Sequence, residues 1–317
     1  MRIDVTFGSA GIDIAGHLYL PGNTTPGTAD RLPSVVVGHP ASGVKEQTAG
    51  LYARRLAEHG FAALAFDCAY QGESGGLPRN LEHPAHRVED LRAAVSFLTT
   101  RPDIDPERIG MLGICASGGY AVSAAATDHR VKALATISAV DIGRAYREGA
   151  DGSQPPEVVQ GMLDQAAAAR TAEARGAETA TFPIFPATEQ QARSGDLHLF
   201  EGWEYYCTDR GQHPRSAKVQ TWNSVDRIVA FDAFRFVAMI APRPLLMIVG
   251  SEAVTRHMSA DAIAAASGPK ELHEIPGATH VALYDRDEYV APALAKLRDF
   301  FRDGLGDRFT TSASARA

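Results

Sequence analysis

The chain has 317 residues, of which 45% are hydrophobic and 22% charged, and its formal net charge is −7 at pH 7. This composition is ordinary for a soluble globular enzyme, and the length suits one large α/β domain with an inserted subdomain or two modest domains. The negative charge comes without a basic block, which argues against a nucleic-acid partner, and no apolar run approaches the length of a membrane span.

The cysteines are few and unpaired in spacing. Cys68, Cys115 and Cys207 are an odd number, which favours a reducing compartment where thiols stay free. Residues 1–4 do not begin a signal peptide. We therefore expect a cytoplasmic protein that has no contact with a membrane.

In chain order, two β-rich segments at residues 3–7 and 12–20 predict a strand pair, and a Thr-, Pro- and Gly-rich surface loop at 23–33 follows it. Apolar runs then predict buried strands at residues 34–38, 61–66, 108–112, 131–140 and 244–250, and residues 271–275 are predicted to form a short last strand. Helical spacing of apolar residues or Ala-rich composition predicts helices at residues 45–59, 84–100, 120–126, 258–267 and 289–301. Ser259 is the predicted N-cap of the fourth of these helices.

The alternation of strands and helices predicts a mostly parallel sheet that helices cover on both faces. From residue 142 to 241 the alternation disappears. We expect an α/β core made of residues 1–141 and 242–306, an inserted helical lid at 142–241 with a helix at 165–180, and a flexible tail at 307–317.

The most informative stretch is Gly-Ile-Cys-Ala-Ser-Gly-Gly at residues 113–119. A strand that turns into a helix within one residue needs small neighbours two positions away on either side, and Gly113 and Ser117 satisfy that need. This is the pattern of a nucleophile elbow, which lifts one side chain above the carboxyl edge of a sheet. Here that side chain is Cys115. A buried structural cysteine is the alternative interpretation.

A cysteine nucleophile needs a base, and His280 follows the last predicted strand, where that base is expected. The carboxylate that would orient the imidazole is ambiguous. Asp141 closes the strand predicted at 131–140, and Glu252 follows the next strand. We favour Asp141 and keep Glu252 as the alternative acid. A Cys–His pair without a third group also stays open.

An acyl-transfer site also needs donors for the developing oxyanion. One is expected to be the backbone N–H of Ala116, directly after the nucleophile. The other should come from the loop after the strand at 34–38, where Pro40 has no N–H, so Ala41 or Ser42 must supply it.

The substrate pocket is predicted from residues near the carboxyl ends of the strands and from the aromatic-rich insertion. Its predicted walls are His39, Tyr70, Trp203 and Tyr206. For each ring of the insertion, packing in the core of the lid itself is the alternative.

With these residues in place, the chain resembles an α/β-hydrolase over nearly its whole length, and the cysteine at the elbow is similar to that of dienelactone hydrolases. Residues 38–47, 113–119 and 226–232 resemble more closely a bacterial and fungal group in which some fungal members act as polyketide thiohydrolases. The resemblance implies an α/β-hydrolase fold with a Cys115–His280 pair and an acid.

Two patterns within this fold bear on the acid. Members of the group often carry Asp where this chain has Val254. Dieckmann cyclases of the same fold with a Cys–Asp–His site take their acid after the preceding strand, which corresponds to Asp141.

We therefore predict an acyl-transfer enzyme without metal or other cofactor. It would hydrolyse an ester, or preferentially a thioester, of an apolar acyl group of polyketide type, presented on a carrier protein or coenzyme A. A Dieckmann-type or lactone-forming cyclase is one alternative. A non-catalytic ligand-binding homologue is another, and a homodimer stays open.

Overall fold

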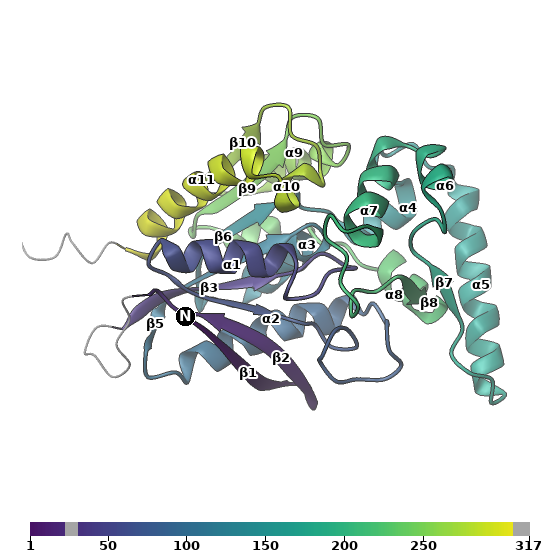
Figure 1. The fold of residues 1–317 in the computed structure, drawn as a ribbon, viewed down its shortest axis with the longest axis horizontal. Coiled ribbons are helices and arrows are strands. Elements are labelled where there is room, and N and C mark those ends of the chain that lie inside the picture. Colours follow the sequence, from purple (N-terminus) through teal and green to yellow (C-terminus); the bar gives the residue numbers. More distant parts are fainter. Residues whose placement is uncertain (23–30, 307–317) are drawn as a thin grey trace, which may run out of the picture.

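The computed structural model describes residues 1–22 and 31–306 (Figure 1). Within these ranges eight strands form one sheet, in the order β1-β2-β4-β3-β5-β6-β9-β10. The strands are β1 (Arg2–Ser9), β2 (Ile12–Tyr19), β3 (Leu32–Gly38), β4 (Ala62–Phe66), β5 (Ile104–Ile114), β6 (Val131–Ile137), β9 (Leu245–Gly250) and β10 (Lys270–Ile275). The β1–β2 and β2–β4 pairs are antiparallel and the others parallel, so the mostly parallel sheet is confirmed.

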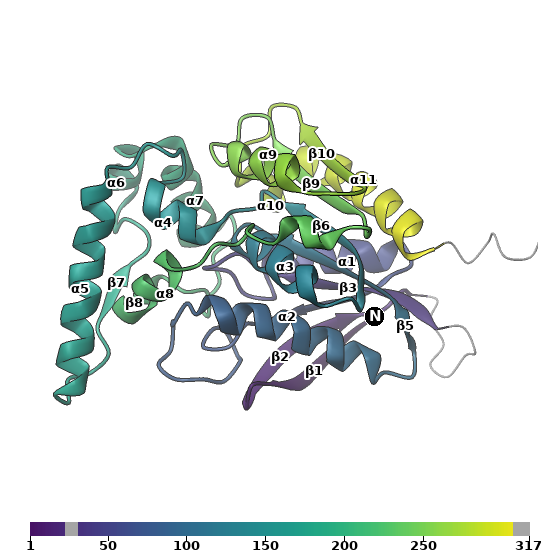
Figure 2. The same cartoon turned by 180° about the vertical axis from the view of Figure 1, so that it is seen from behind.

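Helices cover both faces of the sheet because successive strand residues point to opposite sides. In β3, Val35 and Val37 pack in a cluster with residues of α1 and α11, and Val36 packs in a second cluster with residues of α2, α3 and α9. Figures 1 and 2 show these two helical layers. The core helices are α1 (Thr48–Glu58), α2 (Pro84–Thr99), α3 (Ala116–Thr127), α9 (Arg256–Ala265), α10 (Ala282–Asp285) and α11 (Asp287–Leu305).

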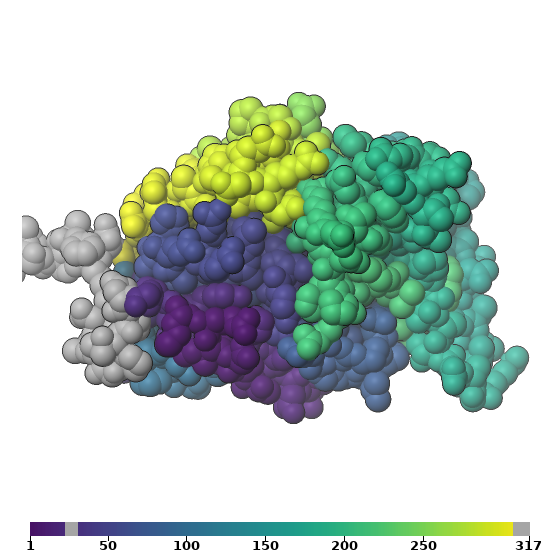
Figure 3. All heavy atoms as spheres, viewed as in Figure 1, coloured from purple at the N-terminus to yellow at the C-terminus, as the bar shows by residue number. Residues whose placement is uncertain are grey.

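The segment between β6 and β9 forms a separate, mostly helical insertion that packs at one end of the core (Figure 3). Its elements are α4 (Ile142–Glu148), α5 (Pro156–Ala174), β7 (Thr181–Pro183), α6 (Glu189–Arg193), α7 (Leu197–Cys207), β8 (Val219–Thr221), η1 (Trp222–Ser224), α8 (Val225–Val229) and η2 (Val237–Ile240). The helix expected at 165–180 is α5, which begins and ends earlier in the chain than predicted.

Two predicted helix starts are wrong. The helix expected from residue 45 begins at Thr48, because Lys45 is instead buried in a turn where its ammonium contacts Asp67 at 2.8 Å. The N-cap of α9 is Thr255, and Ser259 lies buried inside that helix. Residues 23–30 of the predicted loop and the predicted tail at 307–317 lie outside the described residues. No helix in the described ranges is long and apolar enough to cross a membrane.

Candidate active site

Cys115 stands at the sharp turn between β5 and α3. Its backbone has φ 56° and ψ −122°, a left-handed conformation that costs energy for a residue with a side chain. Hydrogen bonds on both sides hold the turn, from Cys115 N–H to the Ile137 carbonyl (2.9 Å) and from Gly118 N–H to the Cys115 carbonyl (2.8 Å). Position 113 must be glycine, because a Cβ there would lie 2.1 Å from the carbonyl oxygen of Ser117.

Two backbone N–H groups point at the Cys115 sulfur, those of Ala116 and Ala41. Ala116 is the first residue of α3, so its N–H is free for an outside acceptor. The Ala41 N–H belongs to the same planar peptide as the Pro40 carbonyl, which points the opposite way. That carbonyl accepts hydrogen bonds from His39 Nδ1 (2.6 Å) and Arg87 Nη2 (3.3 Å), and these bonds fix the direction of the Ala41 N–H.

The His280 ring is buried, with 2% of its surface exposed, and hydroxyl groups meet both of its nitrogens. Nδ1 lies 2.7 Å from Thr255 Oγ1, and Nε2 lies 3.0 Å from the hydroxyl of Tyr284. The Tyr284 hydroxyl also hydrogen-bonds the Cys115 sulfur. Thiol and imidazole are therefore connected through one phenol, which belongs to α10, the short helix that follows His280.

The structure does not bring either expected acid to His280. Asp141 instead caps α4, where its carboxylate accepts the N–H of Arg144 (3.1 Å) and of Ala233 (3.2 Å). Glu252 is exposed and accepts a hydrogen bond from Ser251. Both carboxylates that were expected at the imidazole thus accept hydrogen bonds from other residues instead.

Burial sets the charge state of this group of residues. It lowers the pKa of His280 well below the usual 6.5, and the neighbouring His198 lowers it further, so the imidazole is neutral at pH 7. Burial also raises the pKa of the Cys115 thiol, an effect opposed by the hydrogen bonds from Tyr284, Ala116 and Ala41. The resting site therefore holds a neutral thiol and a neutral imidazole, without a thiolate–imidazolium ion pair.

A cavity of about 230 Å³ lies over Cys115, between the core and the insertion. The core contributes the oxyanion loop, the cysteine and the segment around His280, and the insertion contributes residues from α7 and the segment before α6. The lining residues are Pro40, Ala41, Ser42, Cys115, Ile184, Phe185, His198, Leu199, Gly202, Tyr206, His280, Val281 and Tyr284.

Of the four predicted pocket walls, only Tyr206 lines this cavity. His39 is fully buried beneath the loop, where its Nε2 accepts the N–H of Cys68 at 3.1 Å. Tyr70 is held away from the cysteine by a hydrogen bond to His86 (2.9 Å), and Trp203 stacks on Phe200. His39, Tyr70 and Trp203 are not among the residues that line this cavity.

Comparisons with known proteins place the chain in a family. A profile of the dienelactone hydrolase family matches residues 18–174. The uncharacterized protein YcjY of Escherichia coli K12 is 41% identical over 273 residues, which cover 86% of this chain and 89% of that protein. The chain belongs to the dienelactone hydrolase family.

Structures and more distant relatives extend the assignment. The crystal structure of the hypothetical protein PA2218 from Pseudomonas aeruginosa superposes with a TM-score of 0.89 at 39% identity, covering 96% of this chain and 94% of that one. The thiohydrolase aneE of Aspergillus aculeatus is 26% identical and covers 96% of this chain and 94% of that protein. This family member is thus a hydrolase with the α/β-hydrolase fold.

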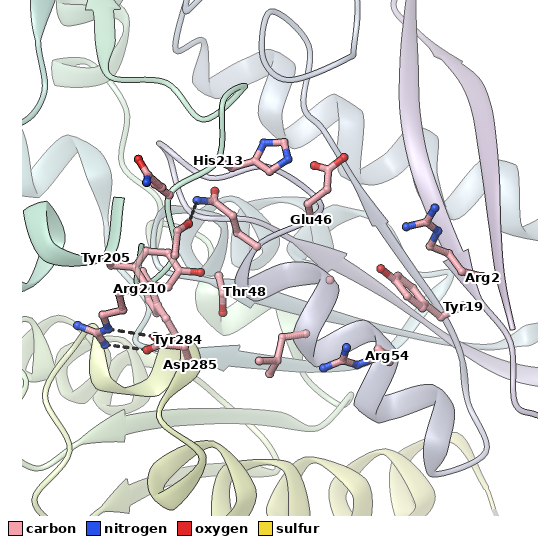
Figure 4. A pocket seen from close by; sticks show the side chains of 15 residues that line it. Arg2, Tyr19, Glu46, Thr48, Arg54, Tyr205, Arg210, His213, Tyr284 and Asp285 are labelled. Carbon is pink, nitrogen blue, oxygen red and sulfur yellow. Dashed lines mark hydrogen bonds and ion pairs between the residues drawn. The ribbon is translucent and has the colours of Figure 1, made fainter. Parts of the chain in front are cut away.

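A second, larger and more open pocket of the hydrolase lies on another side of Tyr284 (Figure 4). Its volume is about 680 Å³, and neither Cys115 nor His280 is among its lining residues. Its walls are polar, and the Arg210 guanidinium there is neutralised by Asp285 at 2.7 Å (Figure 4). The nucleophile therefore belongs to the smaller, mainly apolar cavity.

Three residues of the site were missed from the sequence of this hydrolase: Thr255, Tyr284 and His198. Tyr284 follows His280 by four residues, and that short separation was a usable signal, because two residues so close in the chain stay near each other in the fold. Thr255 and His198 carried no comparable signal, because each reaches His280 only through the tertiary fold.

Proposed function

We propose that this hydrolase is a cysteine-dependent thioesterase in which Cys115 forms an acyl-enzyme. The proposal rests on one observation. Two backbone N–H groups and one phenol meet the Cys115 sulfur, and the same phenol contacts the neutral imidazole that can accept the proton. A neutral imidazole accepts a proton, and paired N–H donors are what a developing oxyanion requires.

In the first half-reaction the Cys115 proton passes to the Tyr284 oxygen as the Tyr284 proton passes to His280 Nε2. The sulfur attacks the thioester carbonyl, and the resulting oxyanion accepts hydrogen bonds from Ala41 and Ala116. When the tetrahedral intermediate collapses, the carbon–sulfur bond to the leaving group breaks. The leaving thiolate takes the proton back from the imidazolium, and the acyl group stays on Cys115.

Water resolves the acyl-enzyme in the second half-reaction. His280 takes a proton from that water, the oxygen attacks the carbonyl carbon, and the acid is released as Cys115 recovers its proton. A thioester suits this nucleophile because sulfur exchanges readily with sulfur, and a relative carries the name thiohydrolase. If an internal nucleophile of the acyl chain replaced water, the product would be a ring that lacks one water.

To test the proposal, the protein is incubated with an activated acyl thioester and its intact mass is measured. We expect an acyl adduct on Cys115 and release of the free acid. Cys115→Ala should abolish both, whereas Cys207→Ser, a substitution outside the cavity, should preserve them. Full turnover by Cys115→Ala would refute the assignment.

One observation favours a ligand-binding homologue without turnover, namely that Nδ1 of His280 meets the neutral hydroxyl of Thr255 and not a charged acid. Such a protein would bind the acyl thioester and release no thiol. The same incubation separates the two functions, because binding without adduct or thiol release supports only the second.

A further inference from the structure

A buried guanidinium lies against the oxyanion loop, residues 39–43, and takes no part in the proton transfers described above. It belongs to Arg87 of α2. Its Nη2 donates to the Pro40 carbonyl at 3.3 Å, and its Nη1 lies 3.2 Å from Nε2 of the His39 ring. The same carbonyl accepts hydrogen bonds from His39 Nδ1 (2.6 Å) and from the Gly43 N–H (2.9 Å). Three donors therefore meet one oxygen, and one of them carries a full charge.

The Pro40 carbonyl and the Ala41 N–H belong to one conjugated peptide group, so a charge applied to the first acts on the second. Linked hydrogen bonds polarise one another, and a bond from a charged donor is stronger than one from a neutral donor. The guanidinium thus draws electron density from the amide nitrogen and makes the Ala41 N–H a stronger donor. That N–H points at the Cys115 sulfur, on the side where the oxyanion is expected.

Glu82 supplies the counter-charge. Its Oε1 accepts the Arg87 Nε–H at 2.9 Å, and each of the two side chains is only 3% exposed. The carboxylate also accepts the Tyr120 hydroxyl and Gln71 Nε2, both at 2.7 Å, and the Glu82 N–H donates to Ser224 of the insertion. The desolvation cost of a buried ion pair can exceed its attraction, so stability alone gives little reason to keep this one. Glu82 takes the Nε edge of the guanidinium, and Nη1 and Nη2 are directed to the loop.

From these contacts, and resting on the proposed function, we propose that Arg87 is a positioning residue of the oxyanion site. Through the Pro40 carbonyl it aims the Ala41 N–H and strengthens it as a donor, and Glu82 limits the charge that reaches the peptide. The Ala116 N–H, at the start of α3, completes the pair of donors without such support.

The surroundings of the guanidinium leave its charge free to act. The titratable side chains that interact with it are Glu82, His39, Cys68, Tyr120 and Asp90. Burial lowers the pKa of His39 and raises those of Cys68 and Tyr120, so these three are neutral at pH 7. Burial also raises the pKa of the Cys115 thiol, and the charge of Arg87 opposes that rise. The thiol therefore reports on this charge.

The test measures the rate at which iodoacetamide labels Cys115 at pH 7, with the labelled peptide identified by mass. Arg87→Met removes the charge at nearly constant length, and we expect labelling to slow about tenfold, because only the thiolate reacts and each pKa unit is a factor of ten. Glu82→Gln removes the counter-charge, so labelling should accelerate. Gln71 Oε1 has no hydrogen-bond partner within the described residues, so a turned Gln71 amide can pair with the new one.

The opposite signs separate a role of the charge from a role in packing. If Arg87 only supported the fold, both variants would slow labelling, and that result, like unchanged rates in both, would overturn the proposal. Arg87→Lys keeps the charge and should label nearly as the wild type does. Arg92→Met, the same change at a less buried position of α2, should have no effect. If Arg87→Met does not fold, the direction of the change in Glu82→Gln decides.

Kinetics with an activated acyl thioester separate positioning from substrate binding. Arg87→Met should lower kcat about tenfold and leave KM within about twofold, because the oxyanion forms only after the substrate has bound. A raised KM at unchanged kcat would instead assign Arg87 to substrate binding and contradict the proposal. If the wild-type protein hydrolyses no thioester, the proposed function fails, whereas the labelling rates still decide on Arg87.

Discussion

A hydroxyl occupies the position at His280 Nδ1 where a carboxylate was expected. Thr255 Oγ1 can accept the Nδ1 proton and so hold the tautomer in which Nε2 faces Tyr284. It brings no charge, however, and cannot stabilise an imidazolium as an acid would. The depressed pKa of the buried His280 is consistent with that lack of a partner charge. The site therefore favours transfer of the thiol proton during the attack rather than a thiolate that is already present in the resting enzyme.

Thr255→Asp should therefore raise the reactivity of the resting thiol. A carboxylate within hydrogen-bonding distance raises a histidine pKa by about 1–3 units, which favours transfer of the thiol proton. We expect iodoacetamide labelling of Cys115 at pH 7 to accelerate about tenfold, since each pKa unit is a factor of ten. Thr255→Val, which removes the hydroxyl without adding charge, is the control. Equal labelling rates in both variants would contradict this account.

At the scale of elements, α7 decides the shape of the cavity. Four of its residues line the space, and one of them, Gly202, contributes no side chain. Glycine inside a helix is less favourable than alanine by about 1 kcal/mol, so its use here costs stability. A Cβ at this position would meet only Phe185, at an ordinary 3.5 Å. The open volume over Cys115 therefore depends on the absence of a side chain at position 202.

Substitution at position 202 should separate stability from acyl-chain length. Gly202→Ala should raise the free energy of unfolding by up to about 1 kcal/mol, as urea melts would measure. Gly202→Leu extends into the cavity and should lower kcat/KM for an octanoyl thioester at least tenfold more than for an acetyl thioester, by loss of acyl-chain volume. If Gly202→Leu hydrolysed both chains as the wild type does, the acyl group would have to bind elsewhere.

At the scale of the whole molecule, specific contacts fix the insertion to the core. Arg210 pairs with Asp285, and the Ser216 hydroxyl donates to the Ser42 carbonyl at 2.7 Å. Thr279, next to His280, donates to the buried Glu201 at 2.8 Å. The cavity wall that α7 supplies is thus held against the catalytic loops, and the site forms only when both parts of the fold are docked.

Buried neutral histidines should make this assembly sensitive to acid. Burial holds the pKa values of His39 and His280 well below 6.5. Below pH 6.5 the unfolded chain therefore binds more protons than the folded one, and the free energy of unfolding decreases as pH falls. Each such histidine contributes a slope of up to about 1.4 kcal/mol per pH unit.

Urea melts at pH 7, 6 and 5 measure that decrease. In His280→Gln the free energy of unfolding should fall less steeply below pH 6.5, because one of the two buried histidines is gone. His129→Gln, at an exposed position, serves as the control. A free energy of unfolding that stays constant between pH 7 and 5 would contradict the prediction.

Much of the architecture was predictable because its signals are local. Continuous apolar runs mark strands buried on both faces, and the small residues around Cys115 are required by a turn that completes itself within seven residues. His280 was predictable as a base candidate because it follows the last strand of the sheet. The candidate oxyanion donors were predictable too, because each is a backbone N–H whose position depends on the elbow or on one neighbouring strand end.

The sequence by itself thus determined which segments form strands, where the elbow lies and which loops follow the strands, because each of these signals is local in the chain. Only the tertiary structure decided that Thr255 meets His280, that Asp141 caps α4, and that Tyr206 lines the cavity over Cys115 while Trp203 does not. The physical reason is direction: many carboxylates and rings have the right chemistry, and which of them reaches the site depends on how segments distant in the chain pack against one another.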